Sequence, residues 1–376
     1  MIIGIPKESL PGENRVAILP TEIKRLLSDE LVFKIESGAG IGSFISDEDY
    51  KVAGAEIVSD VYPASDLIIR INPPSDDKLS IIKEHTSIIS LLSPFTNHEL
   101  VKNLAINNVS SFCLELIPRS TYAQSMDVLS SQATVAGYRA VLNAATHMGK
   151  FFPMLMTPAG TIKPSTVLIL GAGVSGLQAI ATASRLGAKV EAFDVRPAAR
   201  EQVESLGAKF LYMDLDDSAE TDSGYAVEMN EEFIRKEMEL LHNASKRVDA
   251  IITTALIFGK KAPILIKDYM VNDMQTGSCI IDLAAENGGN CELTKPGEIV
   301  NHSGITIDGI LNLPAQVPFH ASQMLSKNIA KLLEEIIEAG KVKFDLNNEI
   351  IKGCLVTHEG KIIHKMTRNI IEGEAN

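Results

Sequence analysis

The chain has 376 residues, 45% of them hydrophobic and 22% charged, and its formal net charge is −13. This composition excludes a disordered protein, and the length predicts two domains rather than one. The negative charge argues against direct binding to nucleic acid or to an anionic membrane surface. The four cysteines have no metal-binding spacing and are expected to be reduced thiols of a cytosolic protein: Cys113, Cys279, Cys291 and Cys354.

No segment is predicted to be a targeting signal or a membrane span. The apolar run before Pro6 and Lys7 has only five residues, too few for a signal peptide. The longest uncharged stretch, Pro164 to Ser184, has the length of a membrane span. However, it contains three glycines and five serines or threonines, and a glycine-rich turn explains it better.

Short apolar runs alternate with helix-like segments, which is typical of an α/β protein with parallel sheets. In the first third, strands are predicted at Met1–Ile5, Phe33–Glu36, Asp66–Ile71, Thr86–Leu92 and Ser110–Leu116. Helices are predicted between them at residues 21–28, 47–53 and 97–107. Tyr122 to Gly149 predicts one long helix, because apolar side chains recur near one face and Gly149 is placed to end it.

The middle third predicts six more strands, at Val167–Leu170, Lys189–Phe193, Lys209–Leu211, Val248–Thr253, Ser278–Asp282 and Ile305–Asp308. Ser322 to Ala339 predicts a helix with one apolar stripe, which Gly340 stops. Val342 to Ile363 alternates like edge strands or a hairpin. Met154 and Met156 are interpreted as core residues.

A glycine-rich turn follows the first strand of the middle third, where Gly171-x-Gly173-x-x-Gly176 leads into a helix. Gly171 permits a tight turn, Gly173 lets the backbone approach a pyrophosphate, and Gly176 lets the helix pack closely on the sheet. The amides of Val174 and Ser175 open the helix, where the helix dipole favours phosphate charge. The alternative is a purely structural glycine turn, since this motif alone is weak.

An acidic residue, Asp194, ends the next predicted strand, 18 residues after Gly176. Its carboxylate can accept hydrogen bonds from both adenosine ribose hydroxyls and would repel a 2′-phosphate, so NAD is favoured over NADP. Val195 is expected beside the same nucleotide. Arg196 argues in the other direction, because an arginine here can hold the 2′-phosphate of NADP.

The predicted fold is therefore α/β, with two Rossmann-like doubly wound parallel-sheet domains joined by a long helix. The first domain is discontinuous and comprises residues 1–125 and 316–376. The second comprises residues 126–315 and includes the linking helix. None of the eight histidines falls in a segment expected beside a nicotinamide, so no acid–base partner for carbonyl or amine chemistry is apparent.

The opening GIPKESLPGENRVAILP resembles a signature shared by alanine dehydrogenases and by the alpha subunits of proton-translocating NAD(P) transhydrogenases. Leu116 to Val141, with its AQSMD core, resembles the transhydrogenase version specifically. The likeness continues through Glu204–Phe210, Ser223–Met229, Ile252–Pro263 and Ser278–Asn290, and it covers essentially the whole chain.

Where the two families differ, the sequence is similar to the transhydrogenases. Asn72 stands where alanine dehydrogenases carry a substrate-binding Lys, Leu92 to Thr96 lacks their catalytic His, and Glu286 replaces their active-site Asp. Losing the Lys and the His removes pyruvate binding and proton transfer together. Hydride transfer between two nicotinamides needs neither residue, because it needs only close and correctly oriented rings.

The resemblance implies an enzyme subunit, the NAD(H)-binding component of a transhydrogenase. Hydride would pass directly between NAD(H) bound here and NADP(H) on a partner subunit, coupled through a membrane component to proton translocation. The resemblance also implies a homodimer, and the edge-like segment Val342 to Ile363 offers a backbone for pairing. The subunit would be cytoplasmic and peripheral, held at the bacterial inner membrane by transmembrane partner subunits.

The resemblance places four residues around the nicotinamide: Arg119, Gln124, Asp127 and Ser130. Arg119 would donate to the carboxamide oxygen, Asp127 would accept from its amine, and Gln124 would bridge toward the ribose and the incoming nucleotide. The alternatives are local, since Asp127 or Ser130 can cap the long helix and Arg119 can form a surface ion pair.

Two further segments are expected at the nucleotide. The acidic stretch Asp214 to Glu232 contains Gly224 and Tyr225 and has the composition of a solvated loop. The resemblance implies that it closes over the nucleotide with its tyrosine. Thr254, Ala255 and Leu256 follow a predicted strand, at the end where such sheets contact their ligand.

Two other functions stay open at the level of sequence. One is an alanine dehydrogenase-type enzyme, which would oxidise NADH in the presence of pyruvate and ammonium. The other is a non-catalytic NAD-responsive module, which would transfer no hydride even with an NADP-binding component present.

Overall fold

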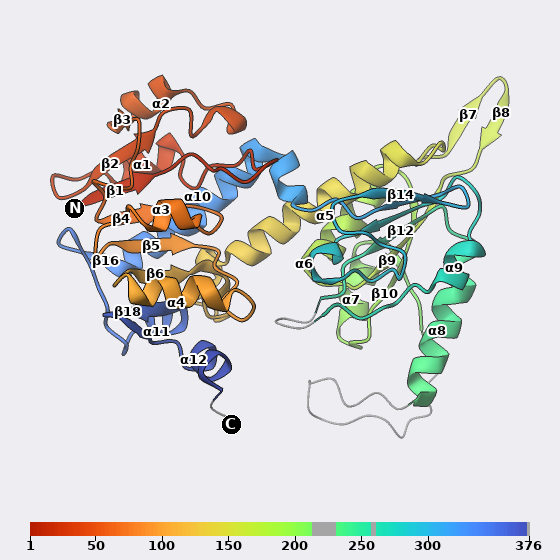
Figure 1. Cartoon of the computed structure of the whole chain (residues 1–376). Coiled ribbons are helices and arrows are strands. Elements are labelled where there is room, and N and C mark those ends of the chain that lie inside the picture. The colour runs from red at the N-terminus through yellow and green to blue at the C-terminus, as the bar shows by residue number, and fades with distance from the viewer. Residues whose placement is uncertain (213–230, 257–260, 374–376) are drawn as a thin grey trace. The chain divides into compact units, whose positions relative to one another are not determined.

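The computed structural model describes residues 1–212, 231–256 and 261–373 (Figure 1). The chain divides into two compact units: unit 1 comprises Met1–Gln132 and Pro314–Asn376, and unit 2 comprises Ala133–Leu313. The sequence places these boundaries a few residues away, after residues 125 and 315. Each unit contains one large, mostly parallel sheet between helices, so the predicted α/β class is confirmed.

Unit 1 is built on an eight-stranded sheet in the order β19-β18-β6-β5-β4-β1-β2-β3. The first six strands of the chain are parallel, and β18 and β19 add an antiparallel edge. The strands are β1 (Ile2–Ile5), β2 (Val32–Glu36), β3 (Glu56–Val58), β4 (Leu67–Ile69), β5 (Ser87–Ser90), β6 (Ser110–Cys113), β18 (Leu355–His358) and β19 (Lys361–Ile362), with a separate hairpin of β16 (Ile337–Glu338) and β17 (Lys341–Val342). The helices are α1 (Pro20–Leu26), α2 (Asp47–Val52), α3 (Asp76–Leu79), α4 (His98–Ile106), α10 (Pro318–Ile336), α11 (Glu349–Cys354) and α12 (Lys365–Glu372), with 3₁₀ turns η1 (Ile41–Ser43), η2 (Leu114–Leu116) and η3 (Ala123–Met126).

Alternate side chains of each central strand in unit 1 enter two different cores. Leu67 and Ile69 of β4 lie in the core that includes Ile329 of α10, whereas Ile68 lies in the core that includes Leu104 of α4. Because both faces of the sheet are covered at its centre, β4 is a continuous apolar run rather than an alternating one.

Unit 2 is built on a seven-stranded sheet in the order β11-β10-β9-β12-β13-β15-β14, and of these seven strands only β14 is antiparallel to its neighbour. The strands are β9 (Thr166–Leu170), β10 (Lys189–Phe193), β11 (Lys209–Phe210), β12 (Ala250–Thr253), β13 (Cys279–Asp282), β14 (Ile299–His302) and β15 (Ile305–Asp308). The helices are α6 (Val174–Arg185), α7 (Ala199–Ser205), α8 (Glu231–Ser245) and α9 (Asp268–Asn272), with the 3₁₀ turn η5 (Ala285–Asn287). Helix α5 (Val128–His147) and the 3₁₀ turn η6 (Leu313–Gln316) contain the two boundaries between the units.

The two sheets share one topology. Counted along the chain, the six parallel strands of each unit stand in the spatial order 3-2-1-4-5-6. The chain reverses its direction of winding between β1 and β4 in unit 1 and between β9 and β12 in unit 2. In open α/β sheets, ligands bind at the carboxyl ends of the strands at this switch point. The fold therefore offers one such position in each unit.

The predicted helix from Tyr122 to Gly149 is wrong at its start. A 3₁₀ turn covers Ala123–Met126, and Asp127 is extended, with φ −71° and ψ 91°. The α-helix begins only at Val128, because the Asp127 carboxylate accepts a hydrogen bond from the Ser130 amide at 2.8 Å and so favours a helix start there.

The segment Val342 to Ile363 is only partly strand. Asn348 accepts hydrogen bonds from the amides of Ile350 and Ile351 and starts helix α11. Strand β18 then lies inside the sheet against β6, and only β19 forms the edge. A polar cap thus overrides the alternating pattern.

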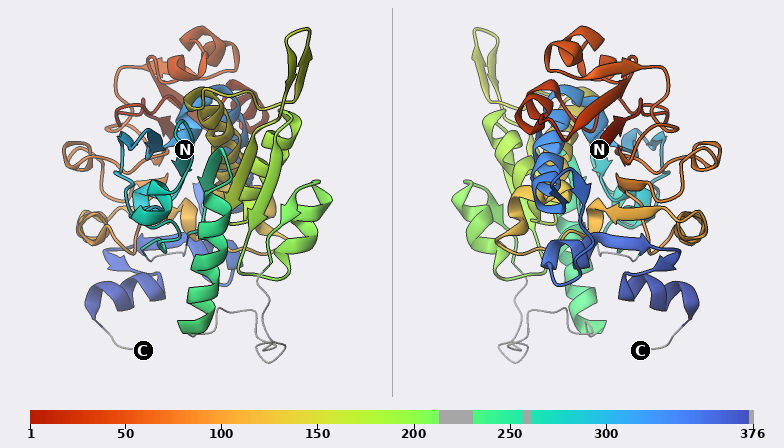
Figure 2. Two further views of the ribbon diagram at one scale, coloured as in Figure 1. Left: turned by 90° about the vertical axis from the view of Figure 1, so that its right-hand side faces the viewer. Right: turned by 90° about the vertical axis from the view of Figure 1, so that its left-hand side faces the viewer.

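The interpretation of Met154 and Met156 as core residues is also wrong. Both are exposed, at a two-stranded hairpin of β7 (Leu155–Thr157) and β8 (Gly160–Ile162) that projects from the body of unit 2 (Figure 2). All four cysteines are free and buried. Across the described ranges, no helix is long and apolar enough to cross a membrane.

Candidate functional site

The glycine-rich turn lies at the switch point of unit 2. Gly171 follows β9 with φ +96°, in the left-handed region that favours glycine. A Cβ on Gly176 would lie 1.9 Å from the Gly171 carbonyl oxygen, so the turn and the helix touch there. A Cβ on Gly173 would meet nothing within 4 Å, so the surface above this residue is open.

Helix α6 begins at this opening. Gly173 is its N-cap residue and has no side chain to satisfy the first amides. Val174 is exposed and Ser175 half-buried. The first N–H groups of a helix lack intrahelical partners and carry partial positive charge. The turn therefore presents amides to any anion that approaches Gly173.

Asp194 follows β10, the neighbouring strand. Its Oδ2 accepts from the Ala172 amide at 2.7 Å, and its Oδ1 accepts from the Arg196 amide at 2.8 Å. The Arg196 guanidinium adds a two-pronged ion pair, with Nε and Nη2 both 2.9 Å from the carboxylate.

Burial raises the pKa of Asp194, but hydrogen bonds from Arg196 and Ala172 outweigh this effect and hold the pKa below its ordinary value. The carboxylate is thus ionised at neutral pH. Val195, between the two, is exposed.

Thr254 closes the other side of the switch point, after β12. Its Oγ1 donates to the Gly171 carbonyl at 3.0 Å, which ties the loop to the glycine turn. Ala255 follows it, and Leu256 is exposed. The structure thus brings the glycine turn, Asp194 and Thr254 to one end of one sheet. Gly224 and Tyr225, expected to cover the nucleotide, lie outside the described residues.

This loop is held by a buried asparagine that the sequence patterns do not predict. Asn290 is fully buried; its Oδ1 accepts from the Ala255 amide at 3.0 Å, and its Nδ2 donates to the carbonyls of Ala255 at 2.9 Å and Pro263 at 2.8 Å. Asp282, at the end of β13, accepts in turn from the Asn290 amide at 2.8 Å. Only the position of Asn290 in the sequence could have indicated its role. It follows the Gly288–Gly289 pair in a loop at the carboxyl end of a strand.

The residues expected at the nicotinamide belong to unit 1. Asp127 and Ser130 contact each other, and the Ser130 Oγ donates to Asp127 Oδ2 at 2.6 Å. Gln124 is exposed on η3, and Arg119 is exposed in the preceding loop. Asn328 of α10 donates to the Ser125 carbonyl at 2.7 Å and so holds η3 in place. The structure brings Asp127 and Ser130 together as a helix cap.

The switch point of unit 1 is filled by the chain's own charges. Glu13 forms a two-pronged ion pair with Arg15, at 2.8 and 2.6 Å, and Glu8 pairs with Arg70 at 3.3 Å. The Asn72 amide donates to Glu8 at 3.3 Å and to Glu13 at 3.1 Å and so joins the two pairs. All four charged side chains are almost completely buried. Each arginine of this cluster is therefore paired with a glutamate of the same unit.

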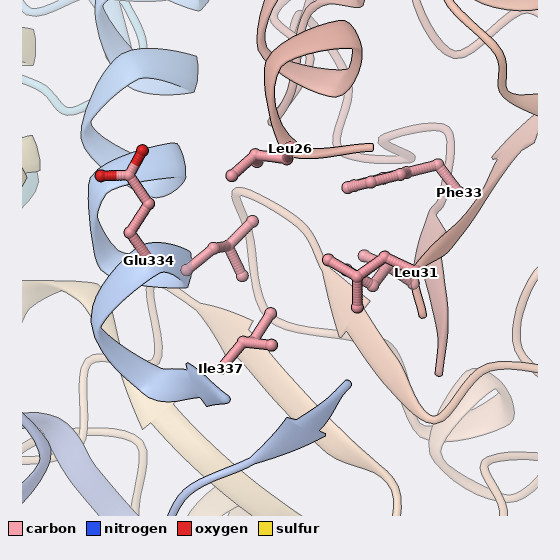
Figure 3. Close-up of a pocket in the computed structure, with 7 residues that line it drawn as sticks. Leu26, Leu31, Phe33, Glu334 and Ile337 are labelled. Atoms are coloured by element: carbon pink, nitrogen blue, oxygen red, sulfur yellow. The ribbon is translucent and has the colours of Figure 1, made fainter. Parts of the chain in front are cut away.

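A separate apolar cavity of about 120 Å³ lies in unit 1 among α1, β2 and α10 (Figure 3). Figure 3 shows the carboxylate of Glu334 pointing away from the apolar side chains of Leu31 and Ile337. The lining is otherwise apolar: Ile3, Leu26, Leu31, Phe33, Leu333 and Ile337. A nucleotide site needs polar groups that converge on the ligand, so this cavity is interpreted as a packing gap.

Two family models match the chain: "Alanine dehydrogenase/PNT, N-terminal domain" over residues 4–136 and "Alanine dehydrogenase/PNT, C-terminal domain" over residues 140–365. The chain is 44% identical to the first component of the NAD(P) transhydrogenase alpha subunit of Rhodospirillum rubrum, covering 97% of this chain and 98% of that one. It is 40% identical to the protein of the same name from Rickettsia prowazekii, covering 97% of each.

Solved structures agree with this relationship. The transhydrogenase from Sinorhizobium meliloti, 38% identical, superposes with a TM-score of 0.86 over 97% of this chain and 100% of that one. An L-alanine dehydrogenase, 25% identical, reaches 0.83 over the whole of both chains. The chain therefore belongs to the alanine dehydrogenase/PNT family and, within it, to the alpha subunits of NAD(P) transhydrogenase.

Proposed function

We propose that this chain is the NAD(H)-binding subunit of a proton-translocating NAD(P) transhydrogenase. The observation that carries the proposal is the switch point of unit 2, where an open glycine turn, a helix N-terminus and the Asp194 carboxylate meet. The amides of Val174 and Ser175 hold the pyrophosphate, and Asp194 accepts from the adenosine ribose. Val195, Arg196, Thr254, Ala255 and Leu256 lie beside the same nucleotide.

The reaction is direct hydride transfer between NAD(H) on this chain and NADP(H) on a partner subunit. Neither ring exchanges a proton at the reacting carbon, so the step needs orientation rather than a general acid or base. Arg119, Gln124, Asp127 and Ser130 orient the nicotinamide. The side-chain carboxylate of Asp127 accepts from the carboxamide amine and fixes which ring face is presented.

The partners follow from the same assignment. Transmembrane subunits couple hydride transfer to proton translocation and hold this chain at the cytoplasmic face of the bacterial inner membrane. The chain acts as a homodimer. The β7–β8 hairpin supports self-association, because residues 151–162 carry no charge on a chain of net charge −13.

Binding and turnover of the isolated protein test the proposal. We expect NADH to bind, with a change in its fluorescence, and no oxidation of NADH by pyruvate and ammonium. Adding the NADP(H)-binding component should then permit hydride transfer, followed by stopped flow as loss of NADH absorbance. Turnover with pyruvate and ammonium on the order of 10 per second would instead identify an amino-acid dehydrogenase. Binding without transfer in the reconstituted system would leave a nucleotide-responsive module.

A further inference from the structure

The hydrogen-bonding capacity of Asp194 is fully used within the protein. An ionised carboxylate offers about four acceptor positions, two on each oxygen. Oδ1 accepts from the amide and the Nε of Arg196, and Oδ2 accepts from the Ala172 amide and the Arg196 Nη2. A ribose would therefore find no free acceptor position on this side chain.

The four donors fall into two kinds. The amides of Ala172 and Arg196 belong to the backbone and fix the orientation of the carboxylate. The other two belong to the guanidinium of Arg196, whose side chain is 61% exposed, whereas the side chain of Asp194 is 6% exposed. The guanidinium can rotate into solvent, and its departure frees one acceptor position on each oxygen. Two neighbouring acceptor positions are what the two hydroxyls of a ribose need.

We propose that Arg196 competes with the adenosine ribose for Asp194, so that NADH binds by displacing the guanidinium while the two backbone amides stay in place. This inference rests on the proposed function. It assigns Arg196 a role opposite to that of a nucleotide ligand: the side chain weakens NADH binding and keeps the site filled between turnovers. An enzyme that must release its nucleotide in each cycle benefits from such a competitor.

The same geometry predicts an effect on nucleotide selectivity. With the guanidinium present, the charge of Asp194 is partly neutralised, which reduces its repulsion of a 2′-phosphate. Without it, the full negative charge faces the ribose position. Removal of the Arg196 side chain should therefore strengthen NADH binding and weaken NADPH binding, and these opposite signs distinguish the proposal from a general change in charge.

Arg200→Ala is a matched control. Arg200 lies four residues further on, is 53% exposed and pairs with Glu204 at 2.9 Å rather than with Asp194. Its loss removes the same charge without removing a partner of Asp194. The dissociation constants of NADH and NADPH are measured by nucleotide fluorescence for the parent protein, Arg196→Ala, Arg196→Lys and Arg200→Ala.

We expect Arg196→Ala to bind NADH about twofold to fivefold more tightly than Arg200→Ala, the range typical of one exposed ion pair. Arg196→Lys, with a single-pronged contact, should fall between Arg196→Ala and the parent. Equal NADH affinity in Arg196→Ala and Arg200→Ala, or weaker binding in Arg196→Ala, overturns the inference while the proposed function stands. A parent protein that binds no NADH overturns both.

Discussion

Glu237 is a buried carboxyl group with an unsatisfied oxygen. It is 4% exposed on α8, and within the described part of the chain its Oε1 has no hydrogen-bond partner. Burial raises the pKa of Glu237. The folded protein therefore binds the proton more tightly than the unfolded chain, and the ionised form opposes folding as the pH rises through the ordinary value and the raised one.

Glu237→Gln should accordingly stabilise the protein at pH 8 by about 1 kcal/mol, because a buried carboxylate is replaced by a neutral amide. The gain should shrink at pH 5, where the carboxyl is more protonated in the folded state. Thermal unfolding at both pH values measures the difference. Glu239→Gln, an exposed neighbour on α8 that pairs with Arg235, is the control and should change little at either pH. A gain independent of pH would contradict the prediction.

At the scale of single residues, sequence identifies those whose partners are local. Asp194 could be singled out because its spacing from the glycine turn is fixed by one strand and one helix. The sequence allows two interpretations of Asp127, a nicotinamide contact and a helix cap. Its contact with Ser130, three residues away, concerns only the helix cap. Asn290 could not be predicted, because its partners at Ala255 and Pro263 come from another loop and are backbone atoms. A hydrogen bond to a backbone group cannot be predicted from the sequence, because almost every residue type carries the same backbone groups.

The contact between α5 and α6 is made through a glycine. A Cβ on Gly137 of α5 would lie 2.1 Å from the carbonyl oxygen of Ser175, in the first turn of α6. The clash is with backbone, so Gly137→Ala must push the two helices apart at the proposed pyrophosphate site. We expect a loss of stability of about 1–3 kcal/mol and weaker NADH binding.

Gly149→Ala is the control for this substitution. It lies just beyond the end of α5, where an added Cβ would meet nothing within 4 Å. Its melting temperature and NADH affinity should match those of the parent. If Gly137→Ala also matched the parent in both measurements, α6 would not be held in place through this contact.

At the scale of elements, patterns of apolar residues located most of the central strands and helices to within a few residues. They failed where a polar side chain sets the boundary, as at Asp127 before α5 and Asn348 before α11. They also failed for the β7–β8 hairpin, whose apolar residues are exposed. The spacing of apolar residues indicates which side chains could be buried. It does not show which of these side chains the fold actually buries.

At the scale of the whole molecule, alternating strands and helices predicted two doubly wound sheets. The order of the strands could not be obtained in the same way, because it depends on contacts between segments far apart in the chain. The addition of β18 and β19 to the first sheet is an example, since β18 pairs with β6, more than 240 residues earlier. The filled switch point of unit 1 was likewise hidden, because Glu8, Glu13 and Arg70 meet only in the folded unit.

The exposed β7–β8 hairpin is the surface through which we expect the whole chain to form a homodimer. Met156 is 76% exposed in the uncharged β7–β8 hairpin, and a two-stranded hairpin is only marginally stable alone in water. We expect sedimentation at micromolar concentration to give twice the chain mass of 40.7 kDa.

Met156→Lys should shift the protein toward monomer, because the new charge must be desolvated at the interface. Val52→Lys replaces an equally exposed apolar residue on α2, at 80%, and should leave the dimer intact. A monomeric parent would contradict the homodimer, and a dimeric Met156→Lys would move the interface away from the hairpin.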